Sequence, residues 1–161
     1  MYIRDAVEAD LEAIVYIYNQ SIPSRNATAD TKPVSVASRA QWYSDRKNYR
    51  PLWVAERNHK ILGWLSFQSF YGRPAYDHTA EVSIYVATEY QRQGIGSKLL
   101  AQAIARSPAL DIKTLLGFIF GHNQPSLNLF TRYGYTQWGY LPDVAELDGI
   151  KRDLIILGRK I

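Results

Sequence analysis

Hydrophobic positions along the chain change repeatedly between helical and strand-like spacing. Apolar residues three and four positions apart predict helices over roughly 11–18, 35–48, 97–105 and 123–132. Shorter runs rich in β-branched and aromatic residues predict strands over 2–4, 52–57, 60–70, 79–87, 114–120, 135–141 and 153–157. Asn58-His59, between the second and third of these runs, predicts a hairpin. The resulting order, β-α-α-β-β-β-α-β-α-β-β, indicates an α/β fold with a mixed sheet.

Length and charge narrow the classes of protein that fit this pattern. The 161 residues, with 47% hydrophobic and 21% charged side chains, predict a single globular domain spanning 1–161. The net charge of +4 comes from basic residues that are scattered rather than gathered in a stripe. We therefore expect no nucleic-acid partner, whereas a small anionic ligand fits this balance.

The absence of some residue types and segments excludes several kinds of site and location. The absence of cysteine removes disulfides, thiolate zinc sites and a cysteine nucleophile. His59, His78 and His122 lie too far apart in sequence to indicate a metal site. Neither a secretory signal at the N-terminus nor an apolar run long enough to span a bilayer is visible. We expect a cytoplasmic protein with no membrane partner and no metal.

The most informative segment joins the strand over 79–87 to the helix that follows it. A helix N-terminus carries unpaired N–H groups and a partial positive charge, which suit a phosphate. Gly94 and Gly96 remove side chains that would keep a ligand from the backbone, and Arg92 adds a forked cation. The spacing fits neither the P-loop nor the dinucleotide fingerprint. On spacing alone, a phosphate site and an ordinary β-α turn with two glycines are about equally good interpretations.

The same turn carries a resemblance to a known family. Gln91-Arg92-Gln93-Gly94-Ile95-Gly96 resembles the coenzyme A loop of the GNAT acetyltransferases, Q/R-x-x-G-x-G/A. Segments within 17–28, 73–86 and 123–127 are similar to the phosphinothricin and methionine sulfoximine N-acetyltransferase branch, and the likeness extends over about 3–141. This resemblance implies a GNAT fold, a mixed twisted sheet of about seven strands with about four helices, opened beside its central strand to admit acetyl-CoA.

The resemblance also implies residue roles. The pantetheine arm pairs with backbone of the central strand, the diphosphate rests on the glycine turn, and the start of the last helix meets the arm. The implied cofactor-binding residues are Ile84, Tyr85, Val86, Gln91, Arg92, Gln93, Gly94, Ile95, Gly96, Ser97, Asn123 and Ser126. Arg73 and Tyr76 fall in the loop that helps bind the amino-acid acceptor, where an arginine can pair with a carboxylate. An ordinary loop arginine explains Arg73 equally well. The branch further implies a homodimer with acceptor sites near the interface.

Glu81 is the candidate catalytic base. Side chains alternate along a strand, so Glu81, Ser83 and Tyr85 share one face of the sheet. A carboxylate there can take a proton from an amine acceptor, directly or through a water. The competing interpretation is a solvent-facing or salt-bridged strand glutamate. Because Ser83 has no visible histidine–carboxylate pair, we expect direct attack of the amine on the thioester in a ternary complex. Backbone N–H groups near Tyr85 and Val86 would hold the oxyanion.

Two features depart from the family pattern. Phe130 stands where many members carry a tyrosine and this branch often a histidine, so no acid for the leaving thiolate is evident. Tyr133 is a possible substitute, although core packing is the more common role for such a residue. The segment 149–153 matches the branch's usual tail only in part. The expected function is N-acetylation of a small amino acid or analogue; the alternatives are an acyl-CoA-binding sensor with little turnover, or a peptide N-acetyltransferase.

Overall fold

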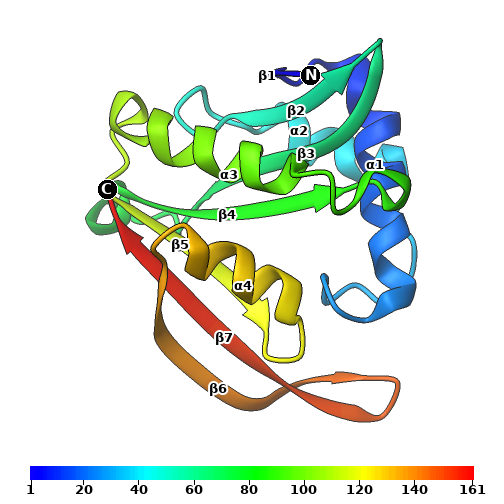
Figure 1. Ribbon diagram of the computed structural model, residues 1–161. Helices are drawn as coiled ribbons and strands as arrows, with labels where there is room; N and C mark the ends of the chain where they lie inside the picture. Colours follow the sequence, from blue (N-terminus) through cyan, green and yellow to red (C-terminus); the bar gives the residue numbers. More distant parts are fainter.

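Seven strands form one mixed sheet, as the computed structural model describes for residues 1–161 (Figure 1). Its order is β1-β2-β3-β4-β5-β7-β6, and only the β4–β5 pair is parallel. The strands are β1 (Tyr2–Asp5), β2 (Leu52–Arg57), β3 (Lys60–Ser69), β4 (Thr79–Val86), β5 (Thr114–Phe120), β6 (Thr136–Leu147) and β7 (Ile150–Lys160). The mixed α/β sheet and the order of elements expected from the sequence are confirmed.

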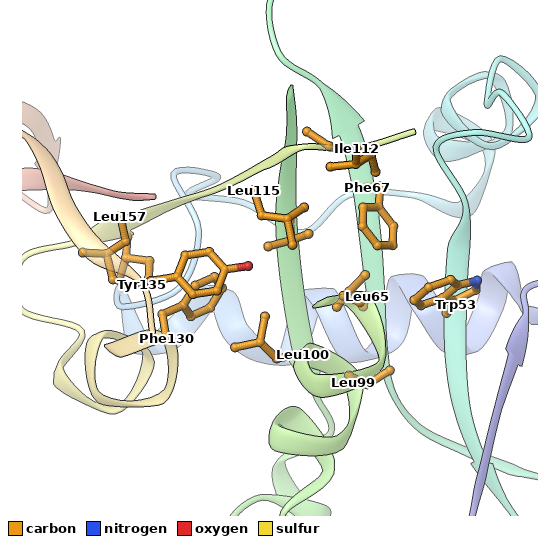
Figure 2. Close-up of a cluster of buried hydrophobic side chains, with 14 of the residues drawn as sticks. Trp53, Leu65, Phe67, Leu99, Leu100, Ile112, Leu115, Phe130, Tyr135 and Leu157 are labelled. Carbon is orange, nitrogen blue, oxygen red and sulfur yellow. The ribbon is translucent and has the colours of Figure 1, made fainter. Parts of the chain in front are cut away.

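Four helices cover the two faces of this sheet (Figure 1). They are α1 (Leu11–Ser21), α2 (Val36–Ser44), α3 (Ile95–Arg106) and α4 (Gln124–Arg132). The larger hydrophobic cluster lies under α3 and α4 and contains Leu65, Leu99 and Leu115 (Figure 2). A smaller cluster joins α1 to the opposite face through Ile14 and Trp64. Neighbouring residues of β3 therefore point into different clusters, as strand alternation requires. No helix has the length and apolar content to cross a membrane.

Several element boundaries differ from the sequence expectation. The helix expected to reach residue 48 ends at Ser44, and the Arg46 guanidinium then donates to the carbonyls of Arg50, Pro51 and Phe67. Strands β6 and β7 are longer than expected because hairpin pairing, and not burial, holds their outer halves. Most β6 side chains are exposed, so they show little of the hydrophobic alternation that marks a strand.

The pairing between β4 and β5 stops part of the way along. It joins residues 79–81 to 114–116, and Glu81 opposite Leu116 is its last pair. Beyond that point β4 remains paired to β3, and β5 to β7. Figure 1 shows the two strands diverging, with α4 beside the opening. The expected opening beside the central strand is therefore present, and Glu81 lies at its vertex.

One contact near the opening gives a stability prediction. A Cβ built on Gly117 of β5 would lie 2.7 Å from the Phe130 ring of α4. We expect Gly117→Ala to lower the free energy of unfolding by about 1–3 kcal/mol, the usual cost of overpacking a core. Urea unfolding measures this, and adding Phe130→Leu should make the pair cost less than the sum of the two single changes. A change below about 0.5 kcal/mol for Gly117→Ala would show that the ring moves freely.

Candidate active site

The glycine turn has the geometry of an open anion cradle. Arg92 and Gly94 both have positive φ, +58° and +79°, and α3 begins at Ile95 directly after Gly94. A Cβ on Gly94 would meet nothing within 4 Å, so the space in front of the turn is free. The first N–H groups of a helix have no intrahelical acceptor. These groups and Arg92 therefore suit a diphosphate, and glycine is favoured at 94 because of its φ.

The edge of β4 that faces the opening offers backbone hydrogen bonds. The N–H of Ala87 bonds to Leu62 of β3, and donors alternate sides along an antiparallel strand. The N–H groups of Ile84 and Val86 therefore point away from β3, toward the opening. The Gln91 side chain already donates to the Val86 carbonyl at 3.4 Å. An extended amide-bearing chain can pair with this edge, and Val86, rather than Tyr85, presents its N–H to it.

Glu81 is a half-buried carboxylate at the vertex of the opening. It lies opposite Gln68 of β3 and Leu116 of β5. Burial raises the pKa of its carboxyl above the ordinary value. No hydrogen bond or salt bridge from another side chain opposes that effect. A carboxylate with a raised pKa and no bound partner is suited to accept a proton.

A cavity of about 120 Å³ opens next to Glu81, on the face covered by α1 and α2. Gln68, directly opposite Glu81, and Ser83, two residues along β4, are part of its wall. The remaining lining residues are Ile14, Val15, Tyr18, Val34, Arg39, Trp42, Trp64, Ser66 and Tyr85. The cavity thus borders the candidate base through Gln68 and Ser83, although Glu81 itself is not part of the lining.

Aromatic rings and one cation dominate the wall. The Trp64 and Tyr85 ring centroids are 4.6 Å apart, and Tyr18 meets Tyr85 edge-on at 5.0 Å. The Arg39 guanidinium lies 5.0 Å from the Tyr18 centroid and 5.8 Å from that of Trp42. Such stacking holds a guanidinium flat and leaves its N–H edge available. Burial is the main reason that the pKa values of Tyr18 and Tyr85 are raised, so both rings stay neutral.

The segment between α1 and α2 is tied across this site. Tyr18 bonds to Thr28 and Asp30, and Asp30 also pairs with Arg39 at 3.2 Å. The Tyr85 hydroxyl donates to the carbonyl of Ala27 at 3.3 Å. These bonds join the segment to α1, to β4 and to α2. They therefore hold the segment in place beside the cavity.

The sequence-derived residues outside the turn are placed differently from one another. Asn123 is buried: its oxygen accepts from the Ser126 N–H at 3.2 Å and its amide donates to Asn26 at 3.1 Å. Its side chain thus caps α4 and holds the α1–α2 segment. Arg73 and Tyr76 are exposed and lie outside the cavity lining.

Phe130 and Tyr133 both serve packing. Phe130 is 4% exposed, and its ring meets Tyr135 edge-on at 4.8 Å (Figure 2). Tyr133 is half-buried against the same cluster, and its carbonyl accepts a bond from Arg159. The Tyr135 hydroxyl is buried without a partner. None of these three rings presents a hydroxyl to the cavity beside Glu81.

Sequence reasoning missed the residues that line the cavity. Arg39, Trp42 and Tyr18 were assigned only to amphipathic helices, and Ser66 and Gln68 only to a strand. They come from separate elements and form no local motif. The one available signal was in β3, where Trp64, Ser66 and Gln68 alternate with Leu65 and Phe67 and so mark a face that is partly polar.

A second hollow lies on another part of the surface. A wider, shallow hollow of about 600 Å³ lies against β1, α1 and β2. Three of its charged groups pair with one another: Arg4 contacts Asp10 at 2.6 Å and Glu56 at 2.7 Å. It includes neither Glu81 nor the glycine turn. No cluster of three or more histidine, aspartate or glutamate side chains is arranged to hold a metal ion.

Known proteins share this sequence and fold over nearly their full length. The model of the Acetyltransferase (GNAT) family matches residues 12–135. A Bacillus subtilis protein, YwnH, provisionally named a phosphinothricin acetyltransferase, is 51% identical and aligns over 100% of this chain and 99% of its own. An L-methionine sulfoximine/L-methionine sulfone acetyltransferase of Pseudomonas aeruginosa is 30% identical over 96% of this chain and 91% of its own.

A solved structure adds a cofactor complex to these relatives. The phosphinothricin acetyltransferase of Sinorhizobium meliloti, crystallised with acetyl-CoA, has a TM-score of 0.93 and 30% identity. The superposition covers 99% of this chain and 88% of that one. The family match, the full-length relatives and the shared architecture agree with one another. This chain belongs to the GNAT family of acetyltransferases.

Proposed function

We propose that residues 1–161 form one catalytic domain that transfers acetyl from acetyl-CoA to the α-amine of a small amino acid or amino-acid analogue. The observation that carries this function is the opening between β4 and β5, with the glycine turn at one end and Glu81 at its vertex. The relatives named for phosphinothricin, methionine sulfoximine and methionine sulfone support the acceptor class. Because acetyl-CoA is a metabolite of the cell interior, the site of action is the cytoplasm.

The residues of the turn and of the β4 edge fit acetyl-CoA. The N–H groups at the start of α3 and the Arg92 guanidinium would hold the diphosphate. Ile84 and Val86 would pair with the amides of the pantetheine arm through the free edge of β4. Gly96 lies in the first turn of α3, where a Cβ would reach van der Waals contact with the Leu129 side chain of α4 at 3.4 Å. Bound there, the cofactor supplies an acetyl thioester that an amine can attack directly.

The protein's own contribution to the reaction is positioning and proton removal. An amine is mostly protonated at neutral pH, so a base must take its proton before attack. Glu81 is the base, directly or through one water. A backbone N–H group on the open edge of β4 stabilises the negative charge that develops on the carbonyl oxygen. Phe130 cannot donate a proton, so α4 supplies no acid at this position. The sulfur of CoA then leaves as a thiolate, which is a better leaving group than an alkoxide.

Residues of the exposed loop between β3 and β4 would bind the acceptor's carboxylate. Arg73 and Tyr76 lie there, and a free guanidinium can bind a carboxylate with two parallel hydrogen bonds. Their exposure in one chain is the arrangement expected if a second copy completes the acceptor site. The active form would then be a homodimer, which sedimentation equilibrium tests.

An acceptor screen tests this function. Purified protein, acetyl-CoA and single acceptors are mixed, and free CoA thiol is measured. We expect release with methionine sulfone, methionine sulfoximine or phosphinothricin, and little with a peptide N-terminus. Release with peptides alone would identify a peptide acetyltransferase. Tight binding of acetyl-CoA with no release for any acceptor would identify a sensor.

A further inference from the structure

The floor of the cavity beside Glu81 is a block of polar side chains on two strands. Ser66 lies opposite Ser83, and Gln68 lies opposite Glu81. Side chains of directly opposed residues stand about 5 Å apart on one face of an antiparallel pair. The four residues therefore form a compact patch, and three of them line the cavity.

The residues of this patch have no hydrogen-bond partners in the protein, whereas buried polar groups ordinarily do. Ser66 is only 1% exposed, yet its hydroxyl bonds to no protein atom and is not enclosed by the core. It lies on the cavity surface, as do Gln68 and Ser83. When a ligand fills the cavity and displaces water, a hydroxyl that the ligand leaves without a partner costs about 1–3 kcal/mol. A ligand group that bonds to this floor avoids that cost.

The rest of the cavity limits what the ligand group can be. Its volume of about 120 Å³ gives room for several waters, and so for a small side chain. The walls are apolar at Ile14, Val15 and Val34. Arg39 is the only charged residue in the lining, and its charge is shared with Asp30 at 3.2 Å. A cationic side chain would be repelled, and an apolar one would leave the floor unpaired.

We propose that this cavity binds the side chain of the acceptor and selects side chains that carry hydrogen-bond-accepting oxygens, such as a sulfone, a phosphinate or a carboxylate. Ser66 is the floor donor and Arg39 the rim donor; the acceptor's amine stays at the Glu81 end. This inference rests on the amino-acid acetyltransferase function proposed above and names the residues that set its specificity. A site with buried donors rejects analogues that cannot bond to them far more strongly than an apolar pocket rejects a missing methylene.

The test compares two acceptors of similar length, methionine sulfone and norleucine. The wild-type ratio of their kcat/KM values should favour the sulfone. Ser66→Ala should lower that ratio about tenfold, the value of one hydrogen bond to a desolvated group. Arg39→Met should lower it further. Ser69→Ala, an exposed serine on the same strand, is the matched control and should leave the ratio unchanged. The KM for acetyl-CoA should stay constant, and thermal unfolding should show that each variant is folded.

The outcomes separate this inference from the function on which it rests. One outcome is that the wild-type protein acetylates both amino acids while neither Ser66→Ala nor Arg39→Met changes the ratio. That result would show that the cavity does not select the acceptor's side chain, and it would leave the acetyltransferase function standing. If wild-type protein releases no CoA with any free amino acid, the proposed function is wrong, and the side-chain site is wrong with it.

Discussion

Glu81→Gln should lower kcat/KM for an amino-acid acceptor by about 100-fold or more, which is the usual contribution of a general base. Glutamine keeps the size of the side chain and its hydrogen bonding but cannot accept the amine's proton. Acetyl-CoA binding should be nearly unchanged, because the turn at 91–97 lies at the other end of β4. Steady-state kinetics and calorimetry measure the two effects separately. Glu12→Gln, the same change at an exposed helix position, should alter neither.

The direction of the Glu81 pKa shift also predicts how the rate changes with pH. The base works only when ionised, so the rate falls as pH falls through the pKa of Glu81. Because burial raises that pKa, this loss begins at a higher pH than for an ordinary glutamate. Glu81→Gln should remove this limb, while protonation of the acceptor's own amine stays common to both proteins. A variant with the same low-pH limb as wild type would show that Glu81 is not the base.

The raised pKa also predicts a gain in stability. A carboxyl whose pKa is higher in the folded state stabilises the fold at low pH, and that contribution is lost as pH rises through the folded pKa. At neutral pH the buried carboxylate is therefore unfavourable. Glu81→Gln should unfold at a higher temperature than wild type at neutral pH, with the gain shrinking in acid. A drop in stability would instead indicate a structural partner for the carboxylate.

Gly94→Val should weaken acetyl-CoA binding by about 100-fold or more, because several charge-assisted hydrogen bonds are worth about 1.5–3 kcal/mol each. The valine side chain would project into the open space where the diphosphate is expected. Positive φ adds a cost in stability of about 1–2 kcal/mol for any residue with a Cβ. Calorimetric titration measures the binding, and urea unfolding measures the stability.

Gly149 provides a control for the backbone cost. Its φ of +77° nearly equals that of Gly94, and a Cβ there also meets nothing within 4 Å. It lies in the β6–β7 hairpin turn, away from the cofactor turn. Gly149→Val should lose similar stability and keep acetyl-CoA binding. If the two variants bind acetyl-CoA equally well, Gly94 serves only the conformation of the turn.

The elements and the cofactor turn could be predicted from sequence because their signals are local. Strand β5 is a continuous apolar run, and the turn at 91–97 is one contiguous motif that ends where α3 begins. The alternation that placed Glu81 on a face with Ser83 and Tyr85 agrees with the β3–β4 register. Local periodicity fixes such faces whatever the rest of the chain does.

The cavity beside Glu81 could not be predicted because it is assembled from distant segments. Arg39 stacks on Trp42 of its own helix and on Tyr18, and only the packing of α1 against α2 brings Tyr18 near. Ser66 gains its importance from having no partner in the fold, which a sequence cannot show. The outer half of β6 was missed for the same reason, since pairing with β7 rather than burial holds it.

A crystal structure of the protein with acetyl-CoA tests the central claim most directly. The account predicts diphosphate oxygens within hydrogen-bond distance of the backbone N–H groups at the start of α3, with the pantetheine arm along β4 and the thioester beside Glu81. A cofactor bound elsewhere, with the N-terminus of α3 and the opening between β4 and β5 both empty, would contradict it.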